Sequence, residues 1–230
     1  MWALFWRLIA AHLFAEFPLG KYFFIANKNR TKYIIIHTAM VLLTTVLVIS
    51  QLAFYRPILF LILPIITFTH ILVDYIKTIP QSSNARVQLI LSAGEQLTHI
   101  GVYIIIAVIF GWMFNYGSPA AFFRLSIAIF VIWANPHFVH SIRCAIKNLE
   151  KVSSYKEPFE RFAFVERTVL FLGLSANSIW FIIAGLIIPS IIRGLLISNQ
   201  ENVPIPVFEW IITIVCAIIP RLIFGPIIFF

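Results

Sequence analysis

Three pairs of a histidine and an acidic residue stand four positions apart in apolar stretches of the sequence. The pairs are His12 with Glu16, His70 with Asp74, and Glu95 with His99. Residues four positions apart share one face of a helix, so each pair can direct two side chains to one point. A chain with nine acids and six histidines is expected to contain roughly half of one such pair by chance. The three pairs therefore indicate a built site.

The chemistry of these side chains is that of a metal site. Neutral imidazole and carboxylate groups are good ligands for zinc, iron and manganese. Together with a further histidine, the pairs offer seven groups, more than a single tetrahedral zinc ion takes. The sequence thus predicts a divalent metal cofactor, either one ion with supporting groups or two ions about 3.5–4 Å apart. The predicted ligands are His12, His37, His70, Asp74 and His99.

The two remaining carboxylates of the set are candidates for catalysis. Glu16 and Glu95 would bind the metal, bridge two ions or act as the general base on a metal-bound water. The same pairs could instead form a structural network of hydrogen bonds between helices, or a path for protons or ions. His137 and His140 follow Asn135-Pro136, which kinks or breaks a helix, and are expected to have a structural or supporting role.

Basic residues near these pairs are candidates for holding an anionic substrate. Lys77 stands two turns after His70 on a similar face, where a lysine can also reach out to lipid headgroups. Lys77, Arg86 and Arg167 are the predicted substrate-binding residues. Glu166 would form a salt bridge between helices or support an anion site.

The elements that must position these side chains are membrane helices. Of 230 residues, 61% are hydrophobic and 11% are charged, and the mean hydropathy is +0.96. This composition excludes a disordered chain, a coiled coil and a soluble globular domain. A spanning helix takes about 20 apolar residues, so we expect an all-α, polytopic bundle of six to seven membrane helices forming one domain over 1–230. The predicted helices cover residues 2–19, which span the membrane or re-enter it, and 33–54, 57–76, 87–114, 119–146, 158–193 and 206–229.

The charges of the loops predict an orientation in the cytoplasmic membrane. Eleven Lys and Arg residues lie in or beside loops 20–32, 77–86 and 147–161, against four on the opposite side. The positive-inside rule then places these three loops in the cytoplasm and the N-terminus outside. All six histidines fall in the cytoplasmic half of this arrangement. The segment 147–161 is expected to be amphipathic and to lie along the inner interface on anionic lipid.

Other features limit the function classes. The two cysteines lie far apart in apolar surroundings and show no disulfide framework or thiolate metal motif. No nucleic-acid fold signature accompanies the net charge of +8, so membrane lipids are the expected partners and nucleic acid is not. Gly173 and Gly185, inside the predicted helix 158–193, indicate close packing between helices.

Four short motifs resemble a bacterial membrane family called domain of unknown function 3307. Residues 11–20 resemble its opening His-x-x-x-Asp-Phe motif, and residues 69–77 its His-x-x-x-Asp element with a trailing lysine. Residues 95–99 resemble its Asp-Gln-x-x-His element, and 166–168 its Glu-Arg-Thr. Glu16 and Glu95 stand where the family usually has Asp, and Gly20 where it has Gln. The resemblance implies a distant similarity to predicted membrane-bound metal-dependent hydrolases, and it places Gln96 beside the ligands as a supporting residue.

The leading hypothesis is therefore a metal-dependent hydrolase of the membrane. Its substrate would be a lipid-like or phosphorylated amphiphile, because the site is expected to open toward the inner leaflet. A transporter or channel for metal ions or protons would use the same ligands as a transit site. A structural subunit of a larger membrane complex would use the polar pairs for assembly and would bind no metal.

Overall fold

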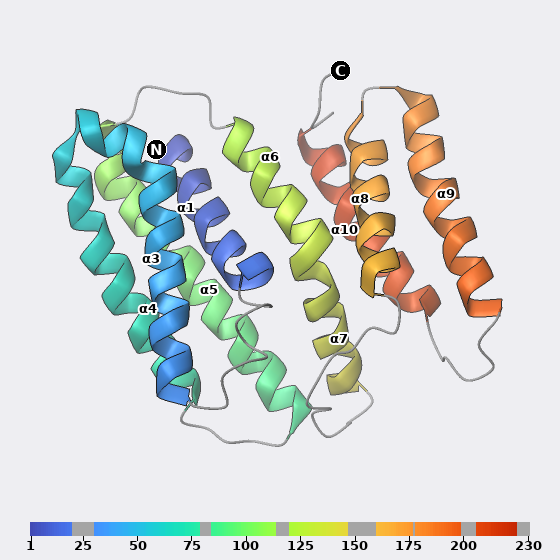
Figure 1. The fold of residues 1–230 in the computed structure, drawn as a ribbon, viewed down its shortest axis with the longest axis horizontal. Helices are drawn as coiled ribbons and strands as arrows, with labels where there is room; N and C mark the ends of the chain where they lie inside the picture. The colour runs from blue at the N-terminus through green and yellow to red at the C-terminus, as the bar shows by residue number, and fades with distance from the viewer. Residues whose placement is uncertain are drawn as a thin grey trace. The chain divides into compact units, whose positions relative to one another are not determined.

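The computed structural model describes residues 1–19, 30–78, 84–113, 120–146, 160–176, 178–198 and 206–224. Over these residues the protein is built from helices (Figure 1). The predicted all-α class is confirmed. The loop segments 20–29, 79–83 and 147–159, which set the predicted orientation, lie outside the described residues.

The helix bounds follow the sequence predictions closely over the first 146 residues. The elements are α1 Trp2–Phe14, η1 Ala15–Leu19, α3 Arg30–Tyr55, η2 Pro57–Leu61, α4 Ile62–Thr78, α5 Ala85–Phe110, η3 Gly111–Met113, α6 Ala120–Ile129, η4 Phe130–Ala134 and α7 Asn135–Ile146. They continue as α8 Glu160–Ser175, α9 Ile179–Ser198 and α10 Pro206–Phe224. The segments η1 and η4 are π-helical, and η2 and η3 are 3₁₀.

The single helix predicted over 158–193 is wrong, because this stretch contains two helices. Helix α8 ends at Ser175 and α9 begins at Ile179 (Figure 1). A continuous helix of that length would be about 54 Å long, far beyond a hydrocarbon core of about 30 Å. The two helices meet at glycines: a Cβ atom on Gly173 would lie 2.5 Å from the Cα atom of Gly185. The predicted close packing at these glycines is confirmed, and it occurs between α8 and α9.

The chain folds into two compact units. Unit 1 consists of Met1–Ile129 and Ala145–Lys151, and unit 2 of Phe130–Cys144 and Val152–Phe230. The prediction of one domain over 1–230 stays a prediction.

Unit 1 is a bundle in which α1 packs against α3, α5 and α6, while α4 packs against α3 and α5. Successive helices run in alternating directions, so the C-terminal ends of α1 and α4 and the N-terminal end of α3 lie toward the same end of the unit (Figure 1). Its apolar core includes Leu4, Leu8, Ile49, Ile66 and Ile106. This core fixes α1 among the other helices and thereby sets the position of the polar residues at its C-terminal end.

Three helical stretches in the described part of the chain are long and apolar enough to cross a membrane. They are Thr31–Ser50, Pro57–Ile76 and Ala85–Phe110. Shorter apolar stretches cover Ala120–Ala134, Ile179–Ile191 and Trp210–Ile219. By length and composition, three helices of the described part of the chain therefore qualify as candidate membrane spans, and the predicted number of six to seven stays a prediction.

Candidate metal centre

The first two residues of the site lie where α1 passes into a π-helical turn. His12 is on the last turn of α1 and is 2% exposed. Glu16 lies in η1, which contains Pro18. Proline has no N–H group, so the usual ladder of hydrogen bonds cannot continue through it. The wider π-helical turn is a local feature that often occurs at functional sites.

Helix α3 brings His37 against Glu16. The Nε2 atom of His37 lies 2.8 Å from Oε2 of Glu16. The ring of Tyr33, one turn earlier on α3, stacks on the His37 ring with centroids 5.6 Å apart and planes within 9°. Stacking on one face fixes the plane of the imidazole and therefore the direction of its lone pair.

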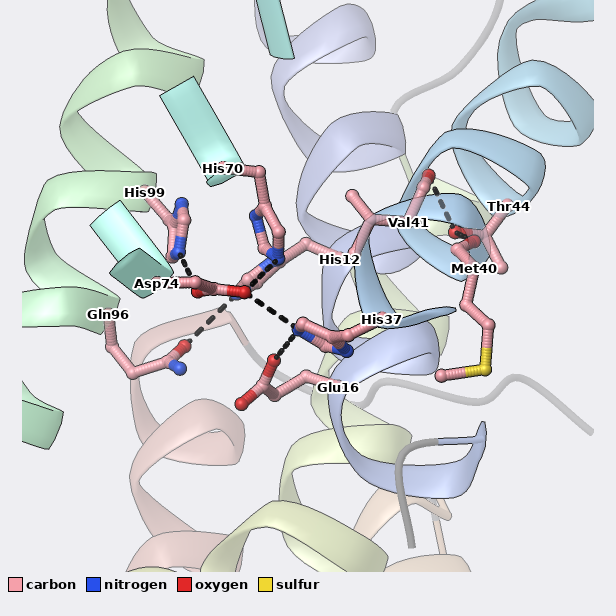
Figure 2. Close-up of polar contacts among 10 residues, drawn as sticks. All are labelled: His12, Glu16, His37, Met40, Val41, Thr44, His70, Asp74, Gln96 and His99. Carbon is pink, nitrogen blue, oxygen red and sulfur yellow. Dashed lines mark hydrogen bonds and ion pairs between the residues drawn. The ribbon is translucent and has the colours of Figure 1, made fainter. Parts of the chain in front are cut away.

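Asp74 of α4 occupies the middle of the site (Figure 2). Its Oδ2 atom lies 3.6 Å from Nε2 of His70 and 3.9 Å from Nε2 of His37. Its Oδ1 atom lies 3.9 Å from Nε2 of His99, which comes from α5. One carboxylate thus faces histidines from three helices, through both of its oxygen atoms.

Helix α5 closes the site from the other side. The His99 ring stacks on that of His70, with centroids 4.3 Å apart, and lies 4.8 Å from that of His12. The Oε1 atom of Gln96 lies 3.1 Å from Nε2 of His12. Glu95, one turn before His99, is also buried. Each of the three predicted pairs therefore has its histidine in the cluster.

These side chains are shielded from solvent. His37 and His70 are each 1% exposed, and the side chain of Glu16, which pairs with His37, is only 11% exposed. Burying imidazole and carboxylate groups is unfavourable unless they are paired or coordinate a metal. Among the described residues, neither ring nitrogen of His70 has a hydrogen-bond partner. A lone pair held inside the protein in this way is suited to a metal ion.

The distances fit metal binding. Two triads, Glu16–His37–His70 and His70–Asp74–His99, each offer three ligand atoms within 4.8 Å of one another. Two atoms that bind one ion at about 2.0–2.2 Å lie roughly 3–4 Å apart, so small side-chain movements would complete either site. Buried histidine and carboxylate groups here could hold a metal ion, as the sequence predicts.

The other predicted residues are placed differently. Arg86 is exposed near the start of α5 and donates from Nε to the carbonyl of Ala145, 3.1 Å away, in the last turn of α7. The side chains of Lys77, His137 and His140 lie outside the described residues, although their backbones are helical.

Two more predicted residues belong to unit 2. Glu166 and Arg167 are buried on α8, at 5% and 7% exposure. Arg167 donates from Nη1 to the carbonyl of Ile132 at 3.2 Å. Ile132 lies in the π-helical segment η4, which also belongs to unit 2. This contact does not connect α8 to the cluster of unit 1, so the substrate and supporting roles of the two residues remain predictions.

Sequence reasoning missed two tyrosines at the site. Tyr33 stacks on His37, and Tyr103, which is 2% exposed, lies with its ring 5.5 Å from that of His12. Tyr33 stands four positions before His37, and Tyr103 four positions after His99. The same helical spacing that identifies the acids would have identified both tyrosines.

Fold and site together define a class of protein, a bundle of apolar helices with a buried cluster of histidine and carboxylate side chains. The profile of the family described as Protein of unknown function (DUF3307) matches residues 4–123, just over half of the chain. The chain belongs to this family, and the match includes every residue of the cluster. No curated protein and no solved structure matches the chain. The family resemblance drawn from the four motifs is confirmed; residues 166–168 lie beyond the matched region.

Proposed function

We propose that this protein is a polytopic membrane protein that holds a divalent metal in unit 1 and uses it for hydrolysis. The observation that carries the proposal is the convergence of histidines from α3, α4 and α5 on the carboxylate of Asp74, with Glu16 against His37 and the His12 ring of α1 against that of His99. Four separate helices direct metal-binding side chains to one buried place, which a merely structural polar contact does not require.

The distribution of apolar side chains supports a membrane location. Phe68 is 68% exposed, whereas His70, two positions later on α4, is 1% exposed. On α5, Leu97 is 68% exposed and His99 is 2% exposed. Two positions along a helix turn the side chain by about 200°, so apolar groups face outward and ionisable groups face inward. Lipid is the solvent that suits this arrangement, and ionisable residues inside a membrane bundle are functional by default.

The division of 158–193 into α8 and α9 changes the proposed number of membrane segments to eight. The segments are α1 with η1, α3, η2 with α4, α5, α6 through α7, α8, α9 and α10. With the N-terminus outside, the segment between α9 and α10 then lies in the cytoplasm. Arg193, near the end of α9, moves to the cytoplasmic side, so the asymmetry of basic residues becomes twelve to three.

In a hydrolase, the residues of the cluster would have separate roles in metal binding and proton transfer. The histidines and Asp74 would hold the ion, which supplies Lewis-acid chemistry by polarising an oxygen and making water more acidic. Glu16 is at the more open edge of the cluster, where one oxygen of its carboxylate can bind an ion while the other accepts a proton and passes it on. A substrate that reaches a site among lipid-facing helices must itself enter from lipid, which favours a lipid-like or phosphorylated amphiphile. Lys77 lies near the end of α4 and Arg86 near the start of α5, on either side of segment 79–83. They would neutralise the charge of the substrate.

The test measures metal and hydrolysis on the same preparation. The full chain, purified in detergent, should contain about one or two equivalents of zinc, manganese or iron by plasma mass spectrometry. The His70→Ala/His99→Ala variant should lose them. Thr44→Ala is the matched control, because Thr44 is buried in α3 and its hydroxyl donates to the carbonyls of Met40 and Val41, on its own helix (Figure 2). It should keep the metal.

Activity is measured as release of phosphate from dodecyl phosphate in mixed micelles. Metal-dependent release that the double variant lacks supports the hydrolase. If the protein binds metal without hydrolysing the substrate, and metal crosses the membrane of liposomes that contain the protein, a transporter replaces the hydrolase as the proposed function. Wild-type protein that contains no metal and takes up none on addition of zinc or manganese would overturn the metal centre itself.

A further inference from the structure

The donors of unit 1 exceed what one ion can use. Both triads include His70, and one ring nitrogen binds only one ion. If each triad holds an ion, one of the two ions therefore needs a donor other than His70. Asp74 supplies it, since Oδ2 lies 3.9 Å from Nε2 of His37 while Oδ1 lies 3.9 Å from Nε2 of His99. Oδ2 also lies 3.6 Å from Nε2 of His70, so one oxygen of the carboxylate faces His37 and His70 while the other faces His99 (Figure 2).

We propose that the cluster is a dinuclear centre bridged by the carboxylate of Asp74. One ion binds Glu16, His37 and Oδ2 of Asp74. The other binds the triad of His70, His99 and Asp74, through Oδ1, with the His70 side chain turning from Oδ2 toward this ion. A carboxylate bridge holds two ions at the separation of about 3.5–4 Å that binuclear hydrolases use. This inference rests on the proposed function and gives the number of ions and the ligands of each.

The charges of the buried groups favour two ions over one. Three carboxylates, of Glu16, Asp74 and Glu95, lie in or beside the cluster, with exposures of about a tenth or less. Buried charges are unfavourable unless opposite charges compensate them. One divalent ion leaves one negative charge buried and unmatched, whereas two divalent ions leave one positive charge, which the anionic group of the proposed substrate would offset.

His12 completes the second position. Nε2 of His12 lies 3.1 Å from Oε1 of Gln96, an acceptor, so this contact favours the tautomer that carries the proton on Nε2. The other ring nitrogen, Nδ1, then has its lone pair available, and it has no hydrogen-bond partner among the described residues. Its ring lies 4.8 Å from that of His99, on the side of the second ion.

The experiment counts ions on the full chain in detergent after loading with zinc or manganese. Wild-type protein should bind two equivalents by native mass spectrometry, and the manganese form should give the spectrum of two exchange-coupled ions by electron paramagnetic resonance. Glu16→Gln and His99→Ala should each leave one uncoupled equivalent, and Asp74→Ala should lose the coupling and most of the metal. Thr44→Ala should keep two coupled ions. Elution as the wild-type species on gel filtration shows that a variant is folded.

The outcomes separate this inference from the proposed function. If the wild type binds one equivalent, and Glu16→Gln binds the same amount, the dinuclear centre is overturned. A mononuclear site at His70, Asp74 and His99 then remains. Two equivalents without exchange coupling overturn the bridge. A wild-type chain that binds no zinc or manganese at all overturns the proposed function as well.

Discussion

Replacing Gln96 with leucine should weaken metal binding by about 10–100-fold, although Gln96 is not among the proposed ligands. The reason is the contact between Oε1 of Gln96 and Nε2 of His12 at 3.1 Å. This contact keeps the proton on Nε2 and the lone pair on Nδ1, and it fixes the plane of the ring. Without it, His12 must find the correct tautomer and orientation when the ion binds.

The expected loss corresponds to about 1.4–2.7 kcal/mol of binding free energy. The loss should appear as a higher Kd in a titration against a chromophoric chelator, with the number of ions at saturation unchanged. Thr98→Val is the matched control, because Thr98 is exposed two positions further along α5 and its hydroxyl donates to the carbonyl of Gly94, on its own helix. Its Kd should equal that of the wild type.

A double-mutant cycle gives the refuting result. If His12 binds the ion and Gln96 acts through it, the His12→Ala/Gln96→Leu variant should bind metal no more weakly than His12→Ala alone. Fully additive losses would show that Gln96 acts independently of His12. An unchanged Kd for Gln96→Leu would show that the contact does not support a ligand, and His12 would leave the proposed site.

Three further predictions concern the helices. Gly185→Ala should destabilise the protein by about 1–3 kcal/mol in thermal unfolding, because its Cβ would lie 2.7 Å from the Cα atom of Gly173. The control Gly101→Ala meets nothing within 4 Å and should be neutral or stabilising, so equal Tm values for the two variants would contradict the close contact. Arg221→Met should cost about 1–3 kcal/mol by the same assay, because it removes the donor to two carbonyls at the end of α8; an unchanged Tm would mean that water replaces it. A reporter placed in segment 199–205 should read cytoplasmic, and an outside reading would contradict the eight-segment topology.

The sequence predicted which polar side chains cluster better than it predicted the helix count, and the reason lies in the residue types. Ionisable residues are rare in apolar helices, so the pairs of His70 with Asp74 and of Glu95 with His99 stood out by spacing alone. His37 has no acid four positions away on its own helix, and only its place near the start of a predicted membrane helix points to the site. The structure gives it Glu16 as a partner from another helix, a contact that local spacing cannot reveal.

The error at α8 and α9 has a different origin. Only three small residues stand between Ser175 and Ile179, so the apolar stretch reads as continuous. Helices in lipid are separated by short polar turns, and a turn this short has almost no compositional signal. Helix length was the better guide, since one helix over 158–193 would be nearly twice as long as a hydrocarbon core of about 30 Å is thick. The sequence pattern assigns Gly173 and Gly185 to one closely packed helix, whereas the structure packs them against each other, between α8 and α9.

The π-helical turn at η1 explains how one short stretch can serve two positions of the proposed centre. In a regular α-helix, His12 and Glu16 would point to the same place, and both would lie against the same ion. Pro18 interrupts the ladder of hydrogen bonds, and the turn over Ala15–Leu19 that carries Glu16 is π-helical, with more residues per turn than an α-helix. Glu16 therefore meets His37 of α3, while His12 lies against His99 of α5. The pair that bounds this π-helical turn therefore reaches His37 on one side of Asp74 and His99 on the other.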